Sequence, residues 1–286
     1  MNEQEEKNQK PVIRMTALDL DGTTLRPDKS LSEPTRSALT EASRKGVHVV
    51  VTTGRVFSAA PEELKTMDGL EYMINSNGAV VTRLKDRKIL RQSLLKPETA
   101  DDLTEFLRGK NLDVEVFADG KAYMNEDAYR KLEENLVEYR SEVSRRYVLS
   151  TRKPTADILE LLHKKREKIE NISLNFSDMD QREEMFRFLG KREDVTLTSS
   201  VWYNMEIGRK GTSKASALLY LMDLLGVKRE ELMACGDSMN DAKMIQLAGI
   251  GVAMENGCAE IKEMADYVTE SNAEDGVAKA FRRFVL

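Results

Sequence analysis

Residues 47–51 read Val-His-Val-Val-Val, an almost uninterrupted apolar run between Gly46 and a polar turn. A strand that is apolar on both faces must be covered on both faces, which is typical of a parallel sheet between two layers of helices. Residues 12–18 and 232–235 form similar runs, and segments with helical periodicity separate these runs along the chain. We therefore predict an α/β fold with a doubly wound, mostly parallel sheet.

Turn residues and helical periodicity predict further elements of this sheet. Residues 33–44 are expected to form a helix, because Ser32 can cap its first turn. Residues 72–74 are predicted as a third strand, followed by a hairpin of residues 79–82 and 88–92. The pattern resumes near the C-terminus with helices over residues 212–225, 241–248 and 276–284 and a strand over residues 250–252.

The alternation is interrupted from Lys96-Pro97 onward. Pro97 suits the first turn of a helix, and residues 112–117 and 121–124 are expected to pair as a hairpin. This middle third mixes strands and helices without the regular alternation, which indicates an inserted α+β module. Its other predicted elements are strands over residues 171–176 and 195–199 and helices around residues 132–139, 158–162 and 184–189.

These patterns divide the chain into a core, an insertion and a tail. Residues 11–94 and 201–286 are expected to form a discontinuous core, and residues 95–200 the inserted domain. Residues 1–10 are polar and charged, and we expect them to form a flexible tail. An insertion of this length is a reasonable size for a small domain.

Composition excludes several classes of function. The net charge of -5 argues against nucleic-acid binding, which needs excess Lys and Arg on one face. No run approaches the roughly 20 apolar residues that span a membrane, and the N-terminus lacks the order of a signal peptide. Cys235 and Cys258 fit no disulfide framework, so we expect a reducing, cytoplasmic setting. His48 and His163 are the chain's two histidines, so acid–base and metal chemistry falls mostly to carboxylates or lysine.

Two carboxylates follow the first predicted strand in Asp19-Leu20-Asp21-Gly22-Thr23. In extended backbone Asp19 and Asp21 share a face, so one can attack an electrophile while the other transfers a proton. The same segment also suits a plain turn, because Asp and Gly are good turn formers. Alone it is therefore weak evidence for catalysis.

Two further segments are also ambiguous when taken singly. Thr53-Gly54-Arg55 offers a hydroxyl and a backbone amide that can bind a phosphate oxygen, although it also fits a simple strand-to-helix turn. Lys214 opens a predicted helix, where a solvated charge is the ordinary alternative. These segments gain meaning only in combination with others.

The segment Gly236-Asp237-Ser238-Met239-Asn240-Asp241 is more informative, because three of its side chains suit metal or phosphate. Asn240 or Asp241 can cap a helix, but capping does not explain Asp237. Strand ends of an open α/β sheet gather ligand-binding groups, so all four segments are expected at one cleft.

Four carboxylates in one cleft would repel one another unless a cation were bound there. Mg²⁺ is the predicted cofactor, because it is a hard ion that prefers oxygen ligands. A site with this ion and Lys214 could accept a phosphoryl group on a carboxylate. The carboxylates concerned are Asp19, Asp21, Asp237 and Asp241.

In their order, these four motifs resemble the haloacid dehalogenase superfamily. Three other segments resemble its Cof-type branch: Asn75-Ser76-Asn77-Gly78-Ala79, Gly251-Val252-Ala253-Met254 and Glu274-Asp275-Gly276-Val277-Ala278. The resemblance runs from Met15 to the C-terminus and implies a Rossmann-like core with a large α/β cap that selects the leaving group. Thr24 and Glu255-Asn256-Gly257 depart from the common pattern without removing a reacting group.

The resemblance also implies a role for each matching residue. Asp19 would be the nucleophile that forms an aspartyl-phosphate, and Asp21 the general acid/base. The Asp19 carboxylate, the Asp21 backbone carbonyl and the Asp237 carboxylate would bind the metal, with Asp241 in support. Phosphate contacts would come from the Leu20 amide, Thr53, Gly54, Lys214 and Asn240.

The leading hypothesis is an enzyme, a Mg²⁺-dependent phosphatase for small phosphorylated metabolites such as sugar phosphates. A phosphomutase would use the same intermediate and return the phosphoryl group to a substrate hydroxyl. A non-catalytic phosphometabolite-binding or signalling protein would have no need of Asp21. The substrate, the oligomeric state and any protein partners stay open at this point.

Three features of the chain keep two interpretations each. The basic run at residues 163–166 could attract an anionic substrate, but a solvated helix end is the simpler interpretation. His48 lies inside a predicted strand, which favours a structural role. Trp202 and Tyr203 could line the cleft or pack in the hinge between the two domains.

Overall fold

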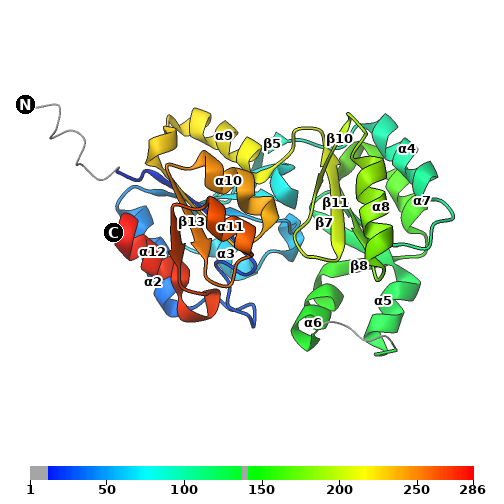
Figure 1. Ribbon diagram of the computed structural model, residues 1–286, viewed down its shortest axis with the longest axis horizontal. Helices are drawn as coiled ribbons and strands as arrows, with labels where there is room; N and C mark the ends of the chain where they lie inside the picture. Colours follow the sequence, from blue (N-terminus) through cyan, green and yellow to red (C-terminus); the bar gives the residue numbers. More distant parts are fainter. Residues whose placement is uncertain (1–11, 137–140) are drawn as a thin grey trace, which may run out of the picture.

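The protein is described by a computed structural model over residues 12–136 and 141–286. Two lobes lie side by side in Figure 1, and each is built around its own sheet. One lobe, called the core, contains both ends of the described chain, and the other, called the cap, contains its middle. The tail predicted for residues 1–10 lies outside the described residues.

The core sheet has the strand order β14-β13-β12-β1-β2-β3-β4-β5. Neighbouring strands are parallel from β14 to β3, whereas β4 and β5 add an antiparallel hairpin at one edge. This confirms the prediction of a doubly wound, mostly parallel sheet. In the same order the strands are Tyr267–Thr269, Ile250–Met254, Leu232–Gly236, Met15–Asp19, His48–Thr52, Leu70–Asn75, Val80–Arg83 and Lys88–Gln92.

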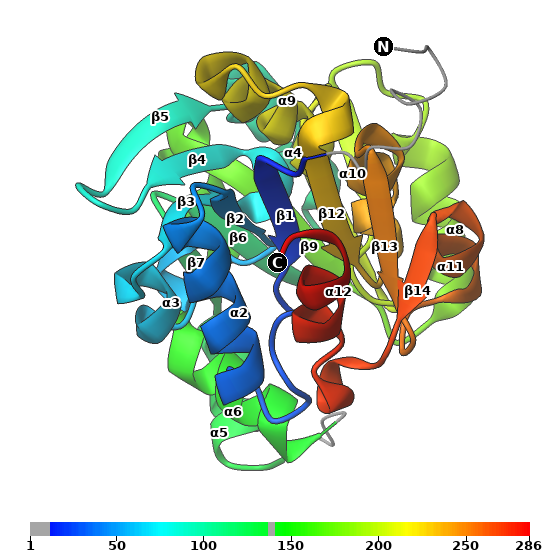
Figure 2. The same ribbon diagram turned by 90° about the vertical axis from the view of Figure 1, so that its left-hand side faces the viewer.

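Helices cover both faces of the core sheet, which explains its uninterrupted apolar strands. Met15 and Ala17 of β1 pack in the cluster that contains α9, whereas Leu18 packs in the cluster that contains α2 and α12. Figure 2 shows these helices on opposite sides of the sheet. The core helices are α2 (Glu33–Arg44), α3 (Glu62–Thr66), α9 (Lys214–Leu225), α10 (Ala242–Leu247), α11 (Ala259–Met264) and α12 (Gly276–Phe284).

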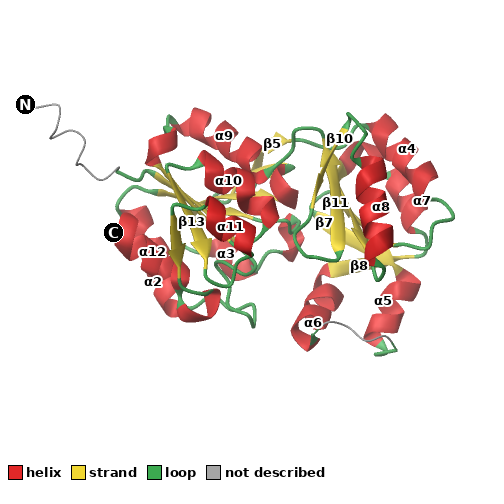
Figure 3. Cartoon of the chain, viewed as in Figure 1, coloured by secondary structure: helices red, strands yellow, loops and turns green. Residues whose placement is uncertain are grey.

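The cap sheet has the order β10-β11-β9-β6-β7-β8 and is antiparallel except between β7 and β8. Figure 3 shows helices on the side of this sheet that faces away from the core. In order along the sheet, the strands are Val195–Thr198, Asn204–Arg209, Ile169–Asn175, Asp113–Ala118, Lys121–Asn125 and Arg152–Thr155. The helices are α4 (Pro97–Leu107), α5 (Glu126–Glu133), α6 (Glu142–Thr151), α7 (Ile158–Lys164) and α8 (Met179–Leu189).

The cap strands alternate between the two faces of their sheet, as expected for a period of two. Val116 of β6, Ile172 of β9 and Ile207 of β11 belong to the apolar cluster under the helices. Their neighbours Glu115 and Glu206 instead line a pocket that they share with core residues. One face of the cap sheet is therefore apolar and helix-covered. The other turns to the core and carries Glu115 and Glu206 together with Phe117 and Ala122, which pack with core residues.

Two predictions about the cap are wrong. Residues 204–209 form β11, which pairs with β9 and β10, so the cap continues past the predicted boundary at residue 201. Met205 and Ile207, two residues apart in β11, both pack in the apolar core of the cap. The chain returns to the core lobe after this strand. A helix was predicted around residues 132–139, but α5 ends at Glu133, and residues 137–140 lie outside the described part.

Two short segments join the core to the cap. The backbone N–H of Ser93 donates to the carbonyl of Ala79 in the core. Two residues later, the backbone N–H of Leu95 donates to the carbonyl of Ile169 in the cap. The hydroxyls of Ser93 and Thr212 lie 2.6 Å apart, so the outgoing and returning segments touch. Among the residues that the structure describes, none of the helices combines the length and the apolar character needed to span a membrane.

Candidate active site

The predicted site residues follow strands that are neighbours in the core sheet. β1 lies between β12 and β2, and all three run parallel, with Leu18 paired to Cys235. Asp19 and Asp237 therefore leave the sheet at the same edge, beside Thr53. Parallel pairing brings together segments that are far apart in the sequence.

A buried lysine joins the carboxylates of this edge. The Lys214 ammonium is ion-paired with Asp19 and donates to Asp241 Oδ1 at 2.6 Å. The side chain of Lys214 is buried at the start of α9, and Asp19 is 5% exposed. The predicted nucleophile therefore lies in direct contact with a fixed positive charge.

Three carboxylates in this cluster are close enough to share a metal ion. Asp19, Asp237 and Asp241 each offer an oxygen, and these atoms lie within 4.8 Å of one another. Burial raises the pKa of Asp19 well above its usual range, although Lys214 opposes this effect. Burial, with the nearby charge of Asp241, raises the pKa of Asp237 to about 7. The cluster is thus an all-oxygen donor set whose negative charge Lys214 offsets only in part, which suits Mg²⁺.

Close packing of two loops fixes Asp237 in this cluster. Gly22 has φ +81°, and a Cβ at this position would lie 2.5 Å from Asp237 Oδ2. The hydroxyl of Thr23 donates to Asp237 Oδ1 at 2.8 Å. The other oxygen of Asp241 accepts the backbone N–H groups of Asp237 and Ser238 at 3.1 and 3.2 Å. A glycine is therefore required at position 22, for its backbone and for the space beside it.

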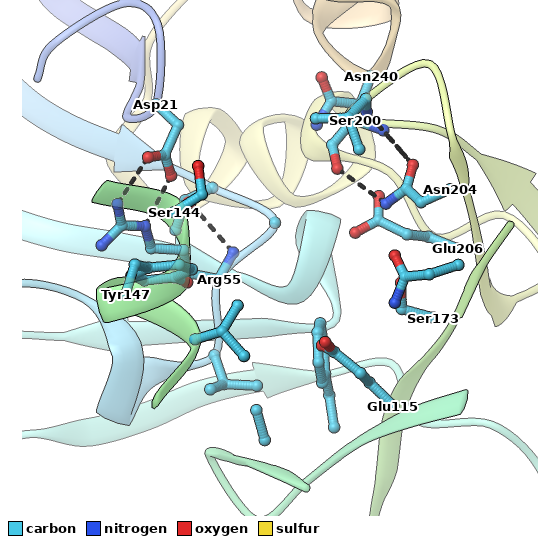
Figure 4. A pocket seen from close by; sticks show the side chains of 18 of the residues that line it. Asp21, Arg55, Glu115, Ser144, Tyr147, Ser173, Ser200, Asn204, Glu206 and Asn240 are labelled. Carbon is cyan, nitrogen blue, oxygen red and sulfur yellow. Dashed lines mark hydrogen bonds and ion pairs between the residues drawn. The ribbon is translucent and has the colours of Figure 1, made fainter. Parts of the chain in front are cut away.

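Asp21 is turned toward a different partner. Arg55 donates to both of its carboxylate oxygens at 2.6 Å (Figure 4). Lys29 donates to Oδ1 at 2.7 Å. Burial raises the pKa of Asp21, but the hydrogen bonds and charge of Arg55 outweigh burial and hold this pKa well below its usual range. Among the described residues, the carboxylates that lie close enough to share a metal ion are those of Asp19, Asp237 and Asp241. The Asp21 side chain is not part of this group.

The predicted phosphate-binding residues also surround the cleft. Thr53, Gly54 and Asn240 line the same pocket as Asp19 and Asp21. Leu20 is buried, and its amide directly follows Asp19 in the turn. Core side chains thus form the floor of the pocket. How these groups contact phosphate remains a prediction from the motifs.

The cap supplies residues that the sequence did not predict for the site. Glu115 accepts from Arg152 at 2.8 Å, and both side chains line the pocket with Ser173, Asn175 and Glu206. Glu206 is 4% exposed, and burial raises its pKa to about 7. A signal existed for Glu115, Ser173, Asn175 and Glu206, because each lies between apolar neighbours in the sequence, but Arg152 has no such neighbours. The polar cap side chains Glu115, Ser173, Asn175 and Glu206, called the polar roof, therefore line the pocket from the cap side.

Tyr147 of α6 is another unpredicted cap residue at the site. Its ring lies 4.3 Å from the Arg55 guanidinium and 5.1 Å from that of Arg152. Figure 4 shows Tyr147 beside the Arg55–Asp21 pair. It therefore joins the cap to a core arginine at the pocket.

The ambiguous residues now have definite surroundings. Tyr203 lines the pocket, whereas Trp202 is 70% exposed. Nδ1 of His48 lies 3.0 Å from Glu71 at the edge of the core, which agrees with a structural role. The basic run at residues 163–166 is at the end of α7, where its side chains pair with surface carboxylates.

The cleft between an α/β core and a polar cap, with a buried Asp–Lys cluster at the strand ends, defines a haloacid dehalogenase-like hydrolase. The family model with this description matches residues 16–281. The chain therefore belongs to this family, which confirms the resemblance predicted from its motifs.

Individual relatives agree with this assignment. The chain is 31% identical to the protein named 5-amino-6-(5-phospho-D-ribitylamino)uracil phosphatase YcsE of Bacillus subtilis, over 96% of each chain. It is 32% identical to Phosphatase YwpJ of the same organism, over 96% of this chain and 100% of the relative. A solved haloacid dehalogenase-like hydrolase from B. subtilis superposes with a TM-score of 0.84 at 30% identity, covering 94% of this chain and 99% of the other.

Proposed function

We propose that this protein is a Mg²⁺-dependent phosphatase that hydrolyses small phosphorylated metabolites through an aspartyl-phosphate on Asp19. The observation that carries the proposal is the contact between Asp19, which lines the pocket, and the buried Lys214 behind it. A carboxylate is a competent nucleophile toward phosphorus when positive charge offsets the charge of the phosphoryl oxygens. Relatives named phosphatases over the whole chain support the same reaction.

In the first step, an oxygen of Asp19 attacks phosphorus, and the bond from phosphorus to the leaving oxygen breaks. Lys214 offsets negative charge on the phosphoryl oxygens, and Thr53 and Asn240 orient them. The proton for the leaving alcohol comes from Asp21. Mg²⁺ bound by Asp19, the Asp21 backbone carbonyl and Asp237 would supply further positive charge beside the phosphoryl group.

In the second step, Asp21 takes a proton from water, whose oxygen attacks phosphorus and releases phosphate from Asp19. For both steps, Asp21 must leave Arg55 and turn toward the leaving oxygen. Its pKa then rises, because the guanidinium that lowers it is no longer its partner. The observed Arg55–Asp21 pair thus represents a resting position of the acid/base.

The polar roof supports a hydrophilic leaving group. Glu115, Ser173 and Glu206 present hydrogen-bonding groups to the pocket above the predicted nucleophile. A leaving group with several hydroxyl or amide groups could hydrogen-bond to Glu115 and Glu206 in addition to their partners Arg152 and Asn77, whereas an apolar one could not. Sugar phosphates meet this requirement, as does a phosphorylated ribitylamino compound of the kind in the name of the relative YcsE.

The test is hydrolysis of para-nitrophenyl phosphate in the presence of Mg²⁺. We expect turnover by the natural protein and a loss of at least about a thousandfold in Asp19→Asn, since the nucleophile is removed. Asp223→Asn is a matched control, because Asp223 is an exposed aspartate on α9. Equal activity of Asp19→Asn and the natural protein would exclude the proposed mechanism, and isomerised sugar phosphate without free phosphate would indicate a phosphomutase.

A further inference from the structure

The turn after β3 has an unusual backbone. Ser76, Asn77 and Gly78 have φ angles of 49°, 54° and 102°, so three consecutive residues lie in the left-handed region. Side chains disfavour this region, although Asn tolerates it better than most. Such a turn persists when its surroundings hold it, and here contacts with both lobes do so.

On the core side, the turn lies against the groups predicted to bind phosphate. A Cβ at Gly78 would be 2.1 Å from the Ser213 carbonyl oxygen, at the start of the helix that carries Lys214. The backbone N–H of Asn77 donates to the backbone carbonyl of Thr53 at 3.0 Å. The turn is therefore in contact with the segments that carry Thr53 and Lys214.

The side chain of Asn77 bridges the core and the cap. Its Oδ1 accepts from Asn240 Nδ2 at 3.1 Å, and its Nδ2 donates to Glu206 Oε2 at 2.9 Å. Asn77 is 5% exposed, so these bonds form in a largely dry interface. Oδ1 of Asn240 in turn accepts from Ser238 Oγ at 2.7 Å.

The chemistry of the two amides fixes their orientation. The NH₂ group of Asn77 faces the cap and its oxygen faces Asn240, which is the orientation that an ionised Glu206, able to accept but not to donate, requires. The Asn77 oxygen accepts from the NH₂ group of Asn240, so the Asn240 oxygen faces the other way. There it accepts from the Ser238 hydroxyl. A reversed Asn77 would bring two NH₂ groups together and set its own oxygen against the Glu206 carboxylate, whose other hydrogen bond is with Ser200.

We propose that Asn77 is a positioning residue that orients the Asn240 amide for the phosphoryl group, and that Glu206 of the cap holds Asn77 in the orientation that does so. This inference rests on the proposed function, in which Asn240 contacts phosphate. Docking of β11 on the core thus completes the phosphate site through a chain of three side chains. When the cap moves away, Asn77 loses its Glu206 acceptor, and Asn240 loses its fixed orientation.

A neighbouring contact provides a matched control. Ser76 Oγ donates to Glu170 Oε2 at 2.6 Å, so this pair also joins the turn to the cap. It does not contact Asn240. Ser76→Ala therefore removes a core–cap hydrogen bond from the same turn and leaves the Glu206–Asn77–Asn240 chain in place.

The first experiment measures binding of inorganic phosphate by isothermal titration in excess Mg²⁺. Asn77→Gly suits the left-handed backbone and removes both hydrogen bonds, so we expect phosphate binding to weaken about tenfold. Ser76→Ala should change it less than about twofold. In the Asn240→Ala background, Asn77→Gly should have no further effect, because Asn77 acts through Asn240.

The second experiment exchanges donor and acceptor between core and cap. Asn77→Asp sets two carboxylates against each other and should raise the KM for para-nitrophenyl phosphate more than it lowers kcat. Adding Glu206→Gln supplies an amide donor from the cap, so the double variant should recover most of the lost kcat/KM. Asp also tolerates the left-handed region, so this pair tests the inference even if Asn77→Gly does not fold.

Natural phosphate affinity in Asn77→Gly would overturn the inference. Equal losses from Asn77→Gly in the natural and the Asn240→Ala backgrounds would also overturn it, as would a double exchange no better than Asn77→Asp alone. The proposed function fails separately, if the natural protein binds phosphate but no substrate is hydrolysed. The titration then still measures whether Asn77 acts through Asn240.

Discussion

Arg55 holds Asp21 at two points, with Nε and Nη2 each 2.6 Å from a carboxylate oxygen. The core arginine is covered in turn by Tyr147 of the cap, whose ring centre lies 4.3 Å from the guanidinium. The resting position of the predicted acid/base is therefore linked to the position of the cap. A change in the docking of the cap would therefore affect Asp21 through the Tyr147–Arg55 contact and the Arg55–Asp21 contact.

Replacing Tyr147 should weaken cap docking without touching a reacting group. Tyr147→Leu removes the stacking on Arg55, a contact typically worth about 0.5–2 kcal/mol. We expect KM for para-nitrophenyl phosphate to rise roughly two- to tenfold, with a smaller change in kcat. Tyr147→Phe keeps the ring and loses only the hydrogen bond of the hydroxyl to Arg152, so KM should rise less than in Tyr147→Leu in the same steady-state assay. Equal KM values for Leu and Phe would show that the stacking has no part in docking.

Gly22 should tolerate no side chain. Gly22→Ala places a Cβ 2.5 Å from Asp237 at φ +81°, so we expect a loss of about 2–4 kcal/mol in unfolding free energy and of Mg²⁺ affinity. Gly109→Ala is the control, since Gly109 has φ +75° and open space around it. It should show only the backbone cost of about 1 kcal/mol in chemical denaturation. Similar losses in both variants would contradict the close packing on Asp237.

Glu206 should make stability depend on pH. Because burial raises its pKa from 4.5 to about 7, the folded state keeps a proton that the unfolded state loses between these values. Its contribution to stability is thus fully present below about pH 4.5 and falls by up to about 3 kcal/mol as pH rises to 7. Urea unfolding across this range should show a shallower decline in Glu206→Gln.

The comparison for this pH series is Glu98→Gln, which changes an exposed glutamate at the start of α4. All proteins are measured in the same Mg²⁺ concentration, so that the aspartate cluster contributes equally. Glu98→Gln should keep the pH dependence of the natural protein. If Glu206→Gln also keeps this pH dependence, the burial of Glu206 makes no contribution to the pH dependence of the unfolding free energy.

Removal of Mg²⁺ should lower stability as well as activity. An ion at a hundred times its dissociation constant stabilises the folded state by about 2.7 kcal/mol. We expect the melting temperature of the natural protein to fall on addition of EDTA, and that of Asp237→Asn to change little. Asp223→Asn should respond like the natural protein. An unchanged Mg²⁺ response in Asp237→Asn would remove Asp237 from the proposed metal site.

The core fold could be predicted because its strands are buried on both faces. The apolar runs of β1, β2 and β12 are visible in sequence, and Gly46 and Gly236 mark where such runs begin or end. Of the edge strands, β5 and β10 were predicted, but β14 and β8 were not. β8, for example, reads Arg-Lys-Pro-Thr and pairs with β7 alone, so it has no apolar alternation to reveal it.

The site could be predicted where the backbone determines it. Asp19 and Asp237 follow adjacent parallel strands, so their proximity results from strand order. The Arg55–Asp21 and Asn77–Glu206 contacts depend instead on side-chain orientation and on how the cap sits against the core. Periodicity carries no information about such distances, so these pairs could not be predicted.

The most direct test of the account is the identity of the phosphorylated residue. The Asp21→Asn variant, which lacks the proposed base for the second step, is mixed with para-nitrophenyl phosphate and Mg²⁺, quenched in acid and digested for mass spectrometry. We predict one phosphoryl group on the peptide that contains Asp19, and none when Asp19→Asn is added. Burst release of nitrophenol with the phosphoryl group on another residue, or on none, would contradict the central claim that Asp19 is the nucleophile.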